Sequence, residues 1–66
     1  MSPEKMVMMA NQIATFFDSQ PGDPAEKVAD HLRDYWEPRM RAQLLAFLDS
    51  GGQGLSPSAL EAARRL

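Results

Sequence analysis

The stretch from Asp30 to Arg41, DHLRDYWEPRMR, gathers the side chains of this chain that have the most binding chemistry. It holds the only tryptophan, the only tyrosine, the only histidine and three of the five arginines. Tryptophan, tyrosine and arginine dominate the binding energy of protein interfaces, and the arginine fork can pair with both oxygens of a carboxylate. So many of these residues in a chain of 66 predict a surface that binds another protein.

The residues expected at that surface lie in this stretch and near the start of the chain. Tyr35 and Trp36 also fall on the apolar stripe of a predicted helix, and this position favours a core role for both rings. His31 lies off the stripe, where surface histidines are common. Val7 and Met8 lie beside the apolar stripe of the first helix and would leave apolar surface exposed unless a partner covers it. The predicted partner-binding residues are Val7, Met8, His31, Arg33, Tyr35, Trp36, Arg39, Met40 and Arg41.

No catalytic constellation can be assembled from these residues. The absence of cysteine excludes disulfides, thiolate zinc sites and iron–sulfur ligation, and the single histidine would leave any metal site to carboxylates. The serines fall at helix starts or in loops. The glycines of SGGQG lack the lysine and the preceding strand of a phosphate-binding loop. We therefore expect no active site, metal or cofactor within this chain.

Charge and hydropathy narrow the class of partner and the compartment. Seven basic and nine acidic residues give a net charge of −2, which argues against non-specific nucleic-acid binding and against an anionic membrane surface. The longest apolar run near the start, Met6 to Ala10, is far shorter than the about 20 residues of a membrane-spanning helix. The absence of cysteine fits a reducing compartment. We expect a soluble, cytoplasmic protein.

Prolines mark the elements that must position the candidate residues. Ser2-Pro3, Asp23-Pro24 and Ser56-Pro57 each put a capping side chain before a proline, which is tolerated at the first helical position. Glu37-Pro38 repeats the pattern with a poorer cap. Apolar residues recur at helical spacing and nowhere alternate as in a strand. The sequence predicts one all-α domain, residues 1–66, a small bundle of three helices plus a short fourth, at about 3–17, 24–36, 38–49 and 57–66.

The helices have apolar stripes that should face a common core. The fourth helix is so short that it is weak alone and should depend on docking for its order. The inward-facing residues predicted for the first two helices are Met6, Met9, Ala10, Ile13, Phe16, Phe17, Ala25, Val28, Ala29, Leu32, Tyr35 and Trp36.

Two segments carry a resemblance to a known family. KMVMMANQIATFF spans Lys5 to Phe17, ADHLRDYWEPRMRAQL spans Ala29 to Leu44, and LSPSALEAARRL at the end is a weaker third. On these segments the chain resembles the delta subunit family of NAD-dependent formate dehydrogenase. The similarity covers nearly the whole chain, apart from the loop around Gln20 to Glu26.

The resemblance implies a non-catalytic accessory subunit of a cytoplasmic complex that oxidises formate and reduces NAD. The molybdenum or tungsten pterin, the iron–sulfur clusters and the flavin would be held by the larger subunits. This chain would bind the large catalytic subunit, with other subunits of the complex as further candidate partners. Its task would be to support assembly, cofactor loading or stability of the complex.

The residues themselves leave two other functions open. The second and third predicted helices, joined by a tight corner, faintly resemble a helix-turn-helix, which would make the chain a small nucleic-acid-binding regulator. Acidic residues interleaved with the arginines of the corner weaken that hypothesis. The other alternative is a homo-oligomeric helical interaction module.

Overall fold

The structure, a computed structural model, describes all 66 residues and contains four helices and no strand. The helices are α1, Pro3–Asp18, α2, Pro24–Tyr35, α3, Pro38–Asp49, and α4, Pro57–Arg64. The prediction of an all-α fold with three helices and a short fourth is confirmed. None of these helices is both long enough and apolar enough to cross a membrane.

The proline-marked starts form as the capping chemistry requires. The side chains of Ser2, Asp23 and Ser56 each accept a hydrogen bond from a backbone N–H in the first turn of the helix that follows. Glu37 makes no such bond, in agreement with its lower rank as a cap. Each helix begins at a proline because that residue has no N–H to leave unpaired.

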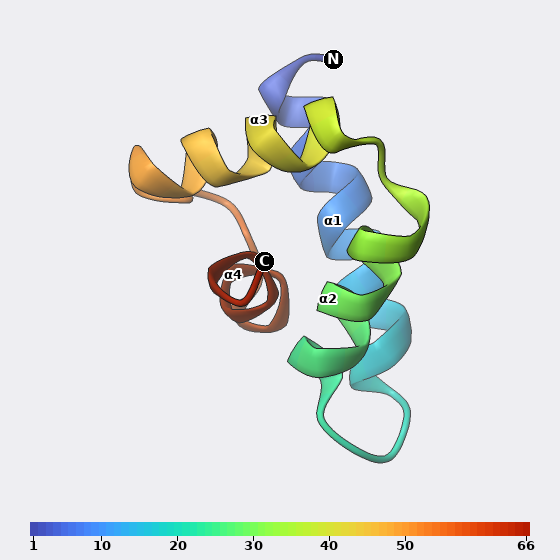
Figure 1. Cartoon of the computed structure of the whole chain (residues 1–66). Helices are drawn as coiled ribbons and strands as arrows, with labels where there is room; N and C mark the ends of the chain where they lie inside the picture. The colour runs from blue at the N-terminus through green and yellow to red at the C-terminus, as the bar shows by residue number, and fades with distance from the viewer.

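The helices are arranged around α4 rather than around a central pair. In Figure 1, α1 and α2 lie side by side and α3 passes across their upper end. The short α4, seen end-on, lies beneath α3 and beside α2. It packs against each of the other three helices and most extensively against α2. The order of α4 therefore depends on docking within its own chain.

Alanine makes up most of the core, which lets the helices approach closely. Seven of the twelve buried hydrophobic residues are alanines, so the large side chains supply only part of the packing. Three of the alanines lie on α4, which explains how so short a helix can contact all the others. The core residues are Met6, Ala10, Ala14, Ala25, Val28, Ala29, Leu32, Trp36, Leu44, Ala59, Ala62 and Ala63.

The loop between α3 and α4 is fixed by backbone geometry and by one asparagine. Gly52 is buried, has φ of +63° and donates its N–H to the Phe47 carbonyl at 3.0 Å. Asn11 of α1 donates from Nδ2 to the Gly54 carbonyl and accepts from the Ser56 N–H through Oδ1, both at 2.8 Å. These bonds hold the start of α4 against α1.

Candidate partner-binding surface

The corner between α2 and α3 contains a buried anchor. Trp36 is only 6 % exposed and belongs to the core, and Met40 is half-buried against it. Because Trp36 is the C-cap of α2, its ring fixes the chain where the helix ends. The core role favoured for Trp36 is therefore confirmed, and little of this ring is available to a partner.

Arg41 satisfies the carbonyl end of α2. The last carbonyls of a helix have no partner within it. The Nη1 group of Arg41, which reaches back from α3, donates to the carbonyls of Leu32 at 3.4 Å, Arg33 at 3.3 Å and Trp36, the last contact being the shortest. The guanidinium that we expected to face a partner is thus bound within the chain.

The other two arginines of the corner differ from each other. Arg33 pairs with Asp30 at 2.9 Å and also donates to the Arg65 carbonyl at 2.7 Å. Its side chain therefore connects α2 to the end of α4. Arg39 is exposed and makes no ion pair or side-chain hydrogen bond. Of the three arginines, Arg39 alone has its guanidinium free for a partner.

A cluster of aromatic side chains lies on the outer side of α1 and α2. We define the aromatic surface as Ile13, Phe16, Phe17, His31 and Tyr35. The rings of His31 and Tyr35 are 4.7 Å apart between centroids, and His31 and Phe17 are 6.1 Å apart. Phe16 meets Phe17 edge to face, with 5.1 Å between centroids. One continuous row of rings therefore connects the two helices.

The two most exposed rings of this row, Phe16 and Tyr35, are ones that the sequence predicts to face the core. Tyr35 is 74 % exposed and Phe16 is 59 % exposed, so the prediction that both face the core is wrong. Ile13, Phe17 and His31 are half-buried. Between these residues and Gln12 lies a shallow hollow of about 300 Å³. Exposed aromatic rings gathered in one place are typical of protein interaction sites.

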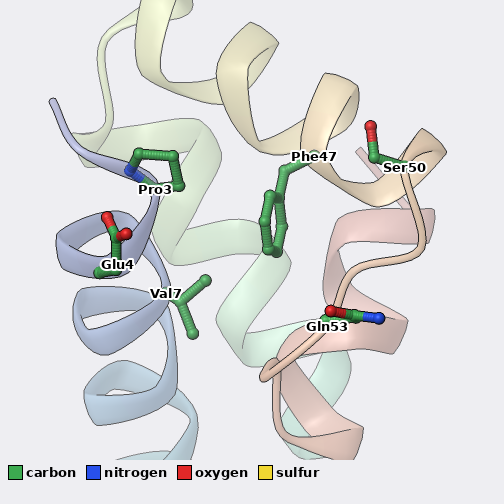
Figure 2. A pocket seen from close by; sticks show the side chains of 6 residues that line it. All are labelled: Pro3, Glu4, Val7, Phe47, Ser50 and Gln53. Carbon is green, nitrogen blue, oxygen red and sulfur yellow. The ribbon is translucent and has the colours of Figure 1, made fainter.

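A second concave surface opens between α1 and the C-terminal half of α3. Val7 of α1 and Phe47 of α3 line a groove of about 400 Å³. Figure 2 shows the Val7 side chain facing the ring of Phe47. Glu4 on α1 and Gln53 on the loop form its polar edges. Met8 is next to Val7 in sequence but is 51 % exposed. Val7 is thus partly covered by its own chain, whereas Met8 is open to solvent.

Sequence reasoning missed Ile13, Phe16 and Phe17 as surface candidates. The missed signal is the width of the apolar pattern on α1, where nine of the residues from Met6 to Phe17 are apolar. A single neighbouring stripe cannot cover so wide a face. The chain buries only the line through Met6, Ala10 and Ala14, and leaves the bulkier residues at its flank.

An ionic cluster joins the beginning of α2 to the end of α4. Arg65 donates to Asp23 at 2.8 Å and to Glu61 at 3.2 Å. The hydrogen bond from Arg65 is the main reason that the pKa of the Asp23 carboxyl lies below its ordinary value. The same bond raises the pKa of the Arg65 guanidinium. All three side chains are solvent-accessible, so this cluster adjusts stability and builds no reactive site.

The arrangement as a whole is suited to binding. The aromatic surface offers rings at its exterior, and its one titratable side chain besides the tyrosine hydroxyl is His31. No group of three histidine, cysteine, aspartate or glutamate side chains is placed to hold a metal ion. The features that stand out are therefore the apolar hollow beside Phe16 and His31, the groove between Val7 and Phe47 with its polar edges, and one row of exposed rings.

Comparison with known families finds a match over nearly the whole chain. The model of the family described as NADH-dependent formate dehydrogenase delta subunit FdsD matches residues 5–63 of the 66. The chain therefore belongs to the FdsD family of formate dehydrogenase delta subunits. A search of curated proteins finds no significant match.

Proposed function

We propose that this chain is a non-catalytic accessory subunit of a cytoplasmic, NAD-dependent formate dehydrogenase. It docks on the large catalytic subunit and supports assembly, cofactor loading or stability of the complex. Membership of the delta subunit family supports the link to this enzyme. The observation that carries the docking role is the aromatic surface, because Phe16 and Tyr35 are large rings that the chain leaves mostly uncovered.

The division of labour follows from the ligand chemistry of the sequence. Formate oxidation coupled to NAD needs redox groups, and the pterin metal, iron–sulfur clusters and flavin expected in this complex need a large scaffold. A chain of 66 residues without cysteine has no thiolate to ligate a cluster. Its contribution is then made through binding, with the larger subunits holding the cofactors.

Binding alone can add substantially to the free energy of unfolding of a large partner. A protein that binds only the folded state of its partner stabilises that state by about 2.7 kcal/mol when its concentration is 100 times the dissociation constant. That figure is a large fraction of the 5–15 kcal/mol that holds a typical domain folded. A small subunit can thus keep a cofactor-loading intermediate folded long enough to be filled.

The predicted partner-binding residues divide into two groups under this proposal. Met8, His31, Tyr35 and Arg39 contact the partner directly, and Val7 does so at the groove. The others act by holding that surface in shape: Trp36 and Met40 pack at the corner, and Arg41 and Arg33 tie α2 to α3 and α4 through carbonyl groups.

The helix-turn-helix alternative finds less support. In that hypothesis α3 would enter the major groove of DNA and would need several basic side chains along its length. The only basic residues of α3 are Arg39 and Arg41, and the Arg41 guanidinium donates to carbonyls of the α2–α3 corner. Absence of DNA binding by the isolated chain at low salt is the expected result.

Co-purification tests the proposed function. We expect the tagged chain, expressed in its own cells, to retain the large catalytic subunit of formate dehydrogenase through washing. We also expect cells that lack the chain to yield enzyme with less bound pterin metal or a shorter half-life at a fixed temperature. Recovery of the chain without any formate dehydrogenase subunit, together with an unchanged enzyme in the deletion strain, would overturn the proposal.

A further inference from the structure

We propose that the aromatic surface binds an arginine side chain that the large catalytic subunit presents. This inference rests on the proposed function and adds the chemistry of the contact. It reverses the polarity that the sequence predicts, in which the arginines of this chain would grip carboxylates of the partner. The rings and carboxylates of α2 instead form the receiving side.

The rings provide one half of such a site. The face of an aromatic ring attracts a cation that lies within about 6 Å of its centre. Tyr35 and Phe16 are exposed by 74 % and 59 %, so their faces are accessible to a side chain from outside. The hollow between Phe16 and His31 has a volume of about 300 Å³, and Gln12 at its edge adds an amide oxygen that can accept a hydrogen bond. This hollow has room for a guanidinium group.

Free carboxylates provide the other half. Asp34 follows His31 by three residues, which makes the two side chains neighbours on the surface of α2. Glu37 follows Tyr35 by two residues at the corner. Both are exposed, and neither makes an ion pair or a side-chain hydrogen bond. An unpaired carboxylate therefore lies beside His31, and another is two residues from Tyr35 in the chain.

The cations that could have neutralised these acids are engaged elsewhere. Arg41, four residues after Glu37, donates to backbone carbonyls. Arg33 pairs with Asp30, and Lys27 donates to the Pro21 carbonyl. Arg39 is the one basic residue near the corner without such a contact. The charge that remains uncompensated beside the rings is therefore mainly negative.

Arginine fits this combination better than lysine does. The planar guanidinium can stack on a ring with its flat face while its edge donates two parallel hydrogen bonds to a carboxylate. An ammonium group is more strongly hydrated and has no flat face to stack. Rings and carboxylate side by side on α2 match both parts of the guanidinium at once.

Binding of purified variants to the formate dehydrogenase complex prepared without its delta chain tests the inference. Asp34→Asn should raise the dissociation constant about tenfold or more, because it removes the negative charge and one of the two acceptor oxygens that a guanidinium would bind. Tyr35→Leu, which keeps the apolar bulk but removes the π face, should raise it about threefold or more. The matched control is Asp49→Asn, an exposed and unpaired carboxylate in the last turn of α3, at the opposite end of that helix from the corner. It should change the constant by less than about twofold.

The outcomes separate this inference from the proposed function. Equal effects of Asp34→Asn and Asp49→Asn would overturn the arginine site while leaving the docking role intact. The same holds if Tyr35→Leu weakens binding but Asp34→Asn does not, since the contact would then be apolar only. If the unaltered chain fails to bind the complex, the proposed function falls and this inference falls with it. Circular dichroism of each variant confirms that the helices are kept.

Discussion

Replacing Arg41 should weaken folding far more than replacing Arg39, although the two residues lie on one turn of α3. Arg41 donates to three carbonyls at the end of α2, whereas the side chain of Arg39 has no partner within the chain. A hydrogen bond that involves a charged group contributes about 1.5–3 kcal/mol. Two of the three contacts are long, at 3.3 and 3.4 Å, so we count the set as about one such bond.

The expected loss for Arg41→Ala is therefore about 2 kcal/mol in the free energy of unfolding. A domain of 66 residues has a total stability of roughly 3–10 kcal/mol, so this loss is large. The midpoint of thermal unfolding should fall by about 8–16 °C. Arg39→Ala should stay within about 0.5 kcal/mol of the unaltered chain because no contact is removed.

Urea unfolding followed by circular dichroism at 222 nm measures both variants under the same conditions. Arg41→Lys should recover only part of the loss, because an ammonium group lacks the length and the fork of the guanidinium. Equal losses for Arg41→Ala and Arg39→Ala would refute the assignment of a structural role to Arg41. So would a loss below about 0.5 kcal/mol for Arg41→Ala.

Three further predictions concern the packing of α4. Asn11→Ala removes both bonds to the loop before α4 and should cost about 1–2 kcal/mol in urea unfolding, whereas a change under about 0.5 would contradict it. Gly52→Ala should lower the free energy of unfolding by about 1–2 kcal/mol, because φ is +63° and the new Cβ would lie 2.8 Å from Leu60 Cδ1. An unchanged midpoint of thermal unfolding would refute this. Because Arg65 lowers the pKa of Asp23 in the folded chain, the stabilising effect of the Asp23 carboxylate should be full above the ordinary value of 3.8 and should be lost as the pH falls through the lower folded-state pKa. A pH series should thus show the unaltered chain more stable than Asp23→Asn at pH 6 and equal to it at low pH, and a gap independent of pH would exclude this linkage.

The helices could be predicted from the sequence because their signals are local. Each begins at a proline that follows a residue in extended conformation, and three of these residues accept a capping bond from the first turn. Glu37, the one residue that the sequence predicts to be a poor cap, makes no capping bond. Capping and proline geometry depend on a few neighbouring residues, so they need no knowledge of the tertiary packing.

The surface was harder to predict because it depends on which helix covers which face. Hydrophobic periodicity puts Phe16 and Tyr35 on the inward stripes, yet both are exposed. The core instead uses alanine, including Ala59, Ala62 and Ala63 of α4. The hydrophobic pattern assigns large apolar residues to the core, whereas close packing of helices favours small residues. The largest rings therefore lie outside the contacts between helices.

The roles of the three arginines show a second limit of prediction from the sequence. Glu37 and Arg41 have the spacing of a favourable ion pair, and no local pattern indicates that the Arg41 guanidinium binds carbonyls instead. The carbonyls of Leu32 and Arg33 at the end of α2 accept from Arg41 because α3 folds back past them, and the Leu32 carbonyl also accepts the N–H of Trp36. Such a contact arises only once two helices are positioned, and this explains why three similar arginines have three different environments.

The most direct measurement is sedimentation of the purified chain mixed with the formate dehydrogenase complex prepared without it, at micromolar concentrations. We predict that the chain moves with the complex in a fixed stoichiometry and that its addition slows thermal inactivation of formate-dependent NAD reduction. A chain that sediments alone at its own mass of 7.4 kDa, beside an enzyme whose inactivation rate is unchanged, would contradict the proposal that it is an accessory subunit of this complex.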